Sequence, residues 1–175
     1  GAITEEILDR NPLHPGALHY NIHSYDDTIH APLGLRAARD YYKVAPSAVH
    51  ALHMGAHIYY ATGRWQLGLE RNIDSFEEAV SRMEDPNSPY HPETFHSLHW
   101  IPYGFQQTGE HDKARQYLAK IARQAEKYGH VHPMARQVFV EARASYIVDT
   151  LDWDSDLLKV QVDLAGLPEY WVVTD

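Results

Sequence analysis

The stretch VHALHMGAHIYYATGRW, residues 49–65, decides the fold that this sequence predicts. Its histidines His50, His53 and His57 follow one another at i, i+3 and i+7, which places their imidazoles on one stripe of a single α-helix. Gly63 is expected to end this helix, because glycine readily takes the left-handed conformation found after helix ends. A partner helix then begins, so the stretch predicts a helical hairpin with histidines along its first helix.

The junction at the end of this helix recurs along the chain. Arg64-Trp65 follows Gly63, Glu110-His111 follows Gly109, and Asp152-Trp153 follows Leu151. These segments look like three copies of one helix–turn–helix junction. Internal repetition of this kind is typical of a solenoid built from stacked helical hairpins.

Hydrophobic periodicity and turn residues divide the whole chain into helical hairpins of this kind. We expect an all-α fold, with one domain formed by a solenoid of three hairpins plus a partial fourth. Ser47 is the expected N-cap of the helix that carries His50. The hairpins are expected at about 14–46, 47–83, 91–129 and 132–160, followed by an extended tail at 160–175 in which Tyr170-Trp171-Val172-Val173 favours β structure.

Composition excludes several classes of function. The 175 residues carry a formal net charge of −9, and Lys and Arg are not clustered as phosphate binding requires, so nucleic acid is not an expected partner. No apolar run approaches the roughly 20 residues of a membrane-spanning helix. The absence of cysteine excludes disulfides and thiolate metal sites. The chain begins at Gly1, and we expect a fragment of a longer protein whose localisation the sequence does not indicate.

Four segments carry a family resemblance. They are HPGALHYNIHSYDD (14–27), APLGLRAARDYYKVAP (31–46), HALHMGAHIYYATGRW (50–65) and FHSLHWIPYGFQQTG (95–109). Together they resemble a group of bacterial tetratricopeptide-repeat (TPR) proteins that carry HPGAxHYxIHxxD, HxxHMPSHIxxxxGxW and HSLHWxxYxxxQxG in this order. The resemblance covers about residues 10–128 and implies a TPR-like fold rather than an activity. The chain departs from the group at Gly55-Ala56, where the family usually has Pro-Ser.

The histidines that match the family motifs are His14, His19, His23, His50, His53, His57, His96 and His99. In stacked hairpins the first helices line the concave face and neighbour one another. The stripes His19/His23/Asp26, His50/His53/His57 and His96/His99/Tyr103 would then lie side by side in a His-lined groove.

Neutral imidazole binds divalent Zn, Ni, Cu and Fe, and a pair at i, i+3 or i, i+4 can place two nitrogens within reach of one ion. We therefore predict ligand or partner binding in the groove, with a divalent metal ion as the leading candidate. The predicted metal ligands are His19, His23, Asp26, His50, His53, His57, His96 and His99.

Three alternatives stay open. Each histidine could instead be a hydrogen-bonded packing residue. The groove could belong to a metal-dependent hydrolase or oxidoreductase, with His19, His23, His53 and His57 as ligands and Asp26 as a weak candidate for the general base. It could also be a plain protein–protein interaction scaffold that captures a peptide. The single ExxH at Glu93–His96 and the absence of HExxH argue against a di-iron bundle and a zincin protease.

Overall fold

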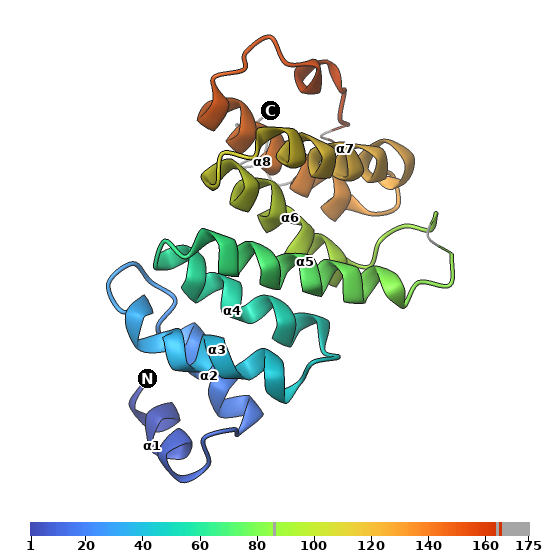
Figure 1. Cartoon of the computed structure of the whole chain (residues 1–175). Coiled ribbons are helices and arrows are strands. Elements are labelled where there is room, and N and C mark those ends of the chain that lie inside the picture. The colour runs from blue at the N-terminus through green and yellow to red at the C-terminus, as the bar shows by residue number, and fades with distance from the viewer. Residues whose placement is uncertain (86, 164, 166–175) are drawn as a thin grey trace. The chain divides into compact units, whose positions relative to one another are not determined.

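The structure, a computed structural model, describes residues 1–85, 87–163 and 165 (Figure 1). Within these residues the fold is all-α and contains no strand, as predicted. None of the described helices is both long and apolar enough to cross a membrane. The helices are α1 (Ala2–Arg10), α2 (Pro15–Ser24), α3 (Leu35–Val44), α4 (Val49–Ala61), α5 (Trp65–Ser81), α6 (Pro92–Gln107), α7 (His111–Tyr128) and α8 (Pro133–Thr150), with 3₁₀ turns η1 (Ala31–Gly34) and η2 (Asp156–Lys159).

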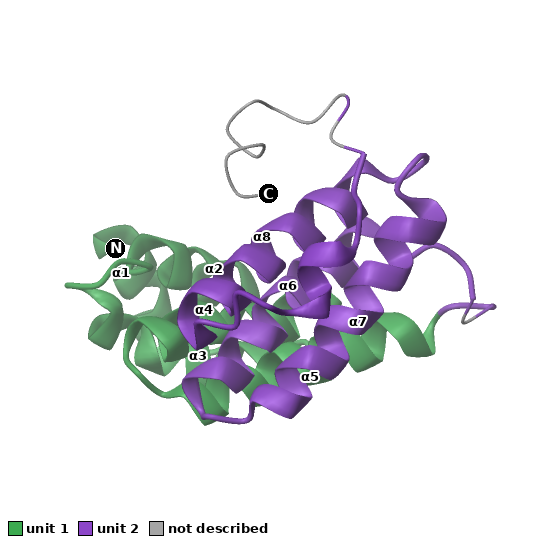
Figure 2. Cartoon of the chain, turned by 90° about the horizontal axis from the view of Figure 1, so that it is seen from above, with its two compact units in different colours: residues 1–82 green, residues 83–175 purple. Residues whose placement is uncertain are grey.

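The chain divides into two compact units (Figure 2). The N-terminal unit, residues 1–82, contains α1 to α5, and the C-terminal unit, residues 83–175, contains α6 to α8. The expected hairpin partners are in contact within each unit: α2 with α3, α4 with α5, and α6 with α7. The single repeat domain with its four hairpins stays a prediction. The β-prone part of the expected tail, residues 170–173, lies outside the described residues.

The core of the N-terminal unit is built by α2, α3 and α4. Leu18, Ile22, Met54 and Ile58 are completely buried there. Close approach of α3 and α4 depends on Gly55, because a Cβ at this position would lie 2.9 Å from the backbone oxygen of Ala38. Gly55 stands where the family motif has proline, and α4 runs through it without interruption. The packing fixes α4 beside α2, with which it is also in contact.

The capping residues at the helix starts match the sequence prediction only in part. At α2, Pro15 occupies the first turn and His14 is the N-cap, with its Nδ1 accepting a hydrogen bond from the Ala17 N–H at 3.1 Å. The prediction that Ser47 caps α4 is wrong. The N-cap there is Ala48, and no side chain caps the helix. Helix α4 is stabilised by its packing instead, since ten of its residues are buried.

The three junctions predicted to be copies share one backbone feature. Gly63, Gly109 and Leu151 have φ of 70°, 76° and 57°, and Leu151 is the one described non-glycine residue with positive φ. After the first two, the next N–H reaches back five residues: Arg64 donates to the Tyr59 oxygen at 2.7 Å, and Glu110 donates to the Phe105 oxygen at 2.8 Å. Each bond satisfies a carbonyl left over at the helix end.

In the C-terminal unit α8 contacts both α6 and α7. Two buried arginines of α8 hold the chain that follows it. Arg143 donates to the Val160 oxygen at 2.8 Å, and Arg136 donates to the Ala165 oxygen at 3.1 Å. Burial lowers the pKa of Arg143 from its usual value. These bonds keep the segment after η2 against α8.

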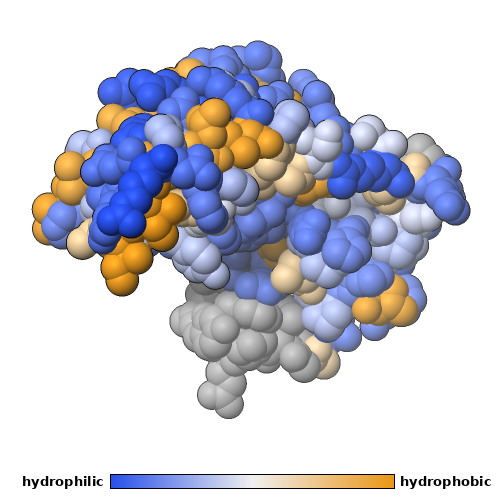
Figure 3. Space-filling view, turned by 90° about the horizontal axis from the view of Figure 1, so that it is seen from below, coloured by the Kyte–Doolittle hydropathy of each residue, from blue (hydrophilic) through white to orange (hydrophobic). Residues whose placement is uncertain are grey.

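Hydrophilic side chains cover most of the face drawn in Figure 3, and apolar side chains form separate small patches among them. The described chain does expose single large apolar side chains, including Ile3, Ile29, Leu33 and Trp153. Scattered exposure of this kind is normal and needs no partner to explain it.

Candidate metal centre

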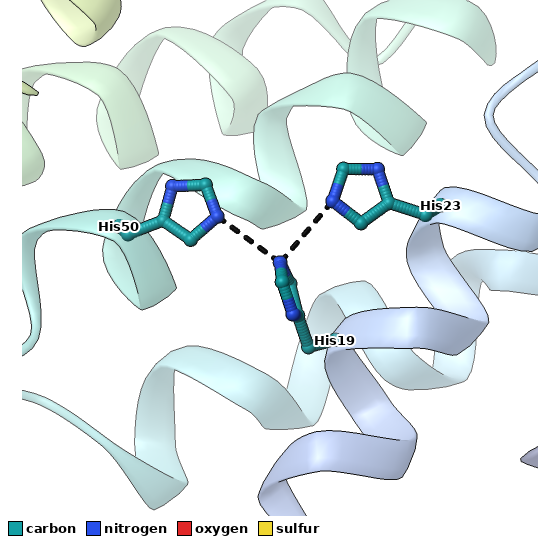
Figure 4. A group of neighbouring side chains, drawn as sticks. All are labelled: His19, His23 and His50. Carbon is teal, nitrogen blue, oxygen red and sulfur yellow. Dashed lines mark hydrogen bonds between the residues drawn. The ribbon is translucent and has the colours of Figure 1, made fainter.

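Two of the predicted histidine stripes meet in the N-terminal unit, because α2 and α4 pack against each other. His19 and His23 come from α2, and His50 comes from the first turn of α4. Figure 4 shows His23 and His50 both directed toward His19. The Nε2 atom of His19 lies 3.0 Å from His50 Nε2 and 3.2 Å from His23 Nε2.

These three nitrogens match the spacing that a metal ion requires. His19, His23 and His50 each offer one ligand nitrogen, and the three nitrogens all lie within 4.8 Å of one another. In a tetrahedral site with metal–nitrogen bonds of about 2.05 Å, neighbouring ligand nitrogens are about 3.3 Å apart. His19 is half-buried, whereas His23 and His50 are exposed. Such a site would keep a coordination position open toward solvent.

A second, more deeply buried group of side chains surrounds His53 on α4. His53 is 1% exposed, and its Nε2 atom lies 2.9 Å from His57 Nε2. The other nitrogen of His53, Nδ1, lies 2.6 Å from the Oδ1 atom of Asn72 on α5. Asn72 uses its NH₂ group to donate to the Gly68 carbonyl at 3.1 Å, so its oxygen faces His53. His53 therefore carries its proton on Nδ1 and donates it to Asn72.

His57 is oriented in the same way by a carboxylate. Its Nδ1 atom lies 2.8 Å from Asp26 Oδ2, and an ionised carboxylate can only accept. In the neutral form both His53 and His57 thus present unprotonated Nε2 atoms to each other. Two lone pairs at this distance repel, and a cation placed against both nitrogens stabilises the arrangement. A carboxylate or amide that fixes the far nitrogen of a histidine is the usual support of a metal ligand.

Burial favours the neutral form of two of these imidazoles, His19 and His57. Burial lowers the pKa of His19 below its usual range, and the neighbouring His50 and His23 lower it further. Burial also lowers the pKa of His57, although Asp26 acts in the opposite direction. Neutral imidazole is the form that binds metal, so the lowered pKa values of His19 and His57 favour the metal-binding form of these two residues.

The two groups of imidazoles adjoin each other. The ring centroids of His23 and His57 are 6.4 Å apart, and those of His50 and His53 are 6.3 Å apart. Asp26 lies beyond the end of α2 rather than on its stripe, and its carboxylate contacts His57. The sequence therefore identified the five histidines and Asp26 as candidate ligands, but it did not predict which of them would contact one another.

The third stripe lies in the C-terminal unit on α6. His96 is exposed, and His99 Nε2 lies 3.6 Å from Glu141 Oε2 on α8. Burial lowers the pKa of His99, with Glu141 acting in the opposite direction. Tyr103 lines a pocket beside His99. The participation of His96 and His99 in a shared metal site stays a prediction.

Two residues that contact the predicted histidines, Asn72 and Glu141, were not predicted from the sequence. Asn72 is completely buried, although it falls between Leu69 and Phe76 at helical spacing. A polar residue on the apolar face of an amphipathic helix was the available signal, because a buried amide needs a partner.

The sequence matches no family model, and it matches none of the curated proteins or solved structures with which it was compared. The resemblance to bacterial TPR proteins accordingly remains a prediction from the motifs.

Proposed function

We propose that the N-terminal unit is a TPR-like helical module that binds a divalent transition-metal ion through the Nε2 atoms of His19, His23 and His50. The observation that carries this proposal is the convergence of three imidazole nitrogens from two helices at 3.0 and 3.2 Å. Packing alone requires no such arrangement, since a partly exposed histidine can satisfy both nitrogens with water. A cation coordinated by the three nitrogens would hold them at about these distances.

The ligand set limits the choice of metal. Imidazole suits Zn²⁺, Cu²⁺, Ni²⁺ and Fe²⁺, whereas Mg²⁺ and Ca²⁺ prefer oxygen ligands. With three protein ligands, the ion keeps a position for water or for an outside ligand. The His53–His57 pair offers a second, weaker position with two imidazoles supported by Asn72 and Asp26. We therefore expect one tightly bound ion and one weaker ion.

Binding is favoured over catalysis by the placement of Asp26. A general base beside a metal-bound water would need a free carboxylate oxygen directed at the ion. Asp26 instead contacts the Nδ1 atom of His57, where it orients the ring. The carboxylate then supports a ligand, which favours a binding role over that of a general base in a metal-dependent hydrolase.

The repeat architecture is part of the proposal. It is supported by the contact between α2 and α4, which are the first helices of successive hairpins, and by the matching left-handed residues at the three junctions. In a TPR-like arrangement neighbouring first helices share one face, which brings the stripes of α2 and α4 together.

The test is a calorimetric titration with Zn²⁺ and Ni²⁺ at neutral pH. The protein is prepared without a His tag or metal column and freed of metal with a chelator. Wild type should bind one ion tightly and gain thermal stability by mass action. The His19→Ala variant should lose at least about a hundredfold in affinity, because losing a ligand costs more than losing a supporting residue.

The matched control is His130→Ala, which removes an exposed histidine of the C-terminal unit and should change nothing. The proposal fails if wild type releases no heat and shows no change in melting temperature. It also fails if His19→Ala and His130→Ala bind the metal equally well, because binding would then come from scattered surface histidines.

A further inference from the structure

The C-terminal unit contains a pocket of about 120 Å³ between α6 and α8. One face of α6 lines it with an imidazole, two aromatic rings and an amide at successive helical positions. From α8 come two small residues, which leave the space open. The lining residues are His99, Trp100, Tyr103, Gln106, Ala142 and Ser145. This pocket has no part in the proposed metal centre.

Gln106 is the unusual member of this lining. Its side chain is 7% exposed, yet neither its NH₂ group nor its carbonyl oxygen has a hydrogen-bond partner in the described chain. Burying a primary amide with both groups unpaired is unfavourable, because each group loses its hydrogen bonds to water and gains none in return. Such a residue is found where a ligand or an ordered water supplies the missing bonds.

The chemistry of the pocket selects an uncharged partner. An anion would satisfy the NH₂ group of Gln106 but would face its carbonyl oxygen, with the Glu141 carboxylate 3.6 Å from His99 nearby. A cation would satisfy the carbonyl oxygen and leave the NH₂ group unpaired. A group with a donor and an acceptor side by side satisfies both atoms in one cyclic pair.

We propose that this pocket binds a carboxamide, which pairs its own oxygen and NH₂ group with those of Gln106. The carboxamide could belong to a small aromatic amide or to an Asn or Gln side chain of a peptide. A cavity of about 150 Å³ accommodates a benzene molecule, so the space of about 120 Å³ here suits a smaller group such as a carboxamide. Trp100 and Tyr103 provide aromatic surface for the part of the ligand beyond the amide.

Benzamide is the probe, used with ¹⁵N-labelled full chain in the presence of a chelator so that the metal centre cannot contribute. Benzamide should shift the side-chain NH₂ signals of Gln106 and the indole signal of Trp100. Benzoate, which has the same shape with a negative charge, should bind at least about tenfold more weakly, because it loses one bond and gains repulsion. N-acetylglutamine methylamide tests the peptide source: tighter binding than benzamide assigns the pocket to a protein side chain, and weaker binding assigns it to a small aromatic amide.

Gln106→Met removes the amide while keeping the length of the side chain. This variant should bind benzamide at least about tenfold more weakly, and it should melt no lower than wild type because no unpaired amide is left buried. Gln107→Met, which changes the exposed neighbour, should bind benzamide as wild type does. The proposal is overturned if the Gln106 signals do not move up to the solubility limit of benzamide. It is equally overturned if wild type binds benzoate as tightly as benzamide. The same holds if the Gln106→Met variant binds benzamide as tightly as wild type does.

Discussion

The two units carry histidines at similar spacing on α4 and α6, and the chemistry that results is different. On α4 the imidazoles of His50 and His57 meet histidines of α2 and the carboxylate of Asp26. On α6 the imidazole of His99 meets Glu141, and the space next to it is a pocket. The helix with the histidines is therefore only half of each site. The residues that the neighbouring helix presents decide whether the nitrogens converge on one point.

The largest difference between the units should appear when one histidine is removed from each. His50→Ala takes one of the three converging nitrogens from the N-terminal unit, so Zn²⁺ affinity should fall by at least about a hundredfold. His99→Ala changes the C-terminal unit and should leave Zn²⁺ affinity within about twofold, since the geometry assigns it no metal contact. Calorimetric titration of both variants measures the contrast. Equal losses would mean that the third stripe joins the metal site, as the sequence alone predicted.

The second comparison concerns the glycines at the two hairpin junctions. A Cβ added at Gly63 or Gly109 would meet nothing within 4 Å, so a substitution there acts through the backbone alone. Because φ is 70° at Gly63 and 76° at Gly109, substitution by valine should lower the free energy of unfolding by about 1–2 kcal/mol at either position. Urea unfolding of Gly63→Val and Gly109→Val should give losses that agree within about 0.5 kcal/mol. Asparagine tolerates the left-handed region and should cost less; a valine variant as stable as the asparagine variant would contradict this account.

These junctions show what the sequence could predict. Helix starts at Trp65 and Pro133 and the left-handed turns at Gly63 and Gly109 depend on local periodicity and on the freedom of single residues. Such properties can be read within a few positions of the chain. The left-handed turns expected at Gly63 and Gly109 therefore lie where local signals predicted them, whereas Ser47 does not cap α4.

For the candidate site, the sequence could predict which histidines take part but not which residues they contact. The sequence predicted that His19, His23 and His50 would lie on neighbouring stripes, because the first helices of successive hairpins were expected to lie side by side. The partners of the buried groups could not be predicted. Asn72 and Glu141 come from helices packed against α4 and α6, and their positions depend on the rotation of each helix about its axis. That rotation is decided by core packing, which the local pattern does not specify.

The third prediction uses the pH dependence of stability to compare the half-buried histidines of the two units in the metal-free protein. The pKa values of His19, His57 and His99 are lowered on folding, so the unfolded chain binds more protons. The free energy of unfolding should therefore fall as the pH drops through about 6.5, the pKa of an unperturbed histidine, and level off below the folded values.

Urea unfolding at a series of pH values in the presence of a chelator measures this loss. His99→Gln should flatten the pH dependence that comes from the C-terminal unit, whereas His57→Gln should flatten that of the N-terminal unit. A stability that stays constant or rises on acidification between about pH 7.5 and 5.5 would show that these imidazoles are not held neutral.

The smallest effect is expected at the third junction, where Leu151 occupies the position that glycine takes in the other two. Its φ of 57° costs a leucine about 1–2 kcal/mol, and its side chain is 69% exposed, so little packing depends on it. Glycine would remove that strain but would add about 0.5–1 kcal/mol of conformational freedom to the unfolded chain. Leu151→Gly should consequently raise the free energy of unfolding by about 0.5 kcal/mol. Leu151→Ala removes the same side chain and keeps the strain, so it should bring no gain. If the alanine variant proved as stable as the glycine variant in urea unfolding, the side chain rather than the backbone would limit this junction, and the likeness among the three turns would be one of position only.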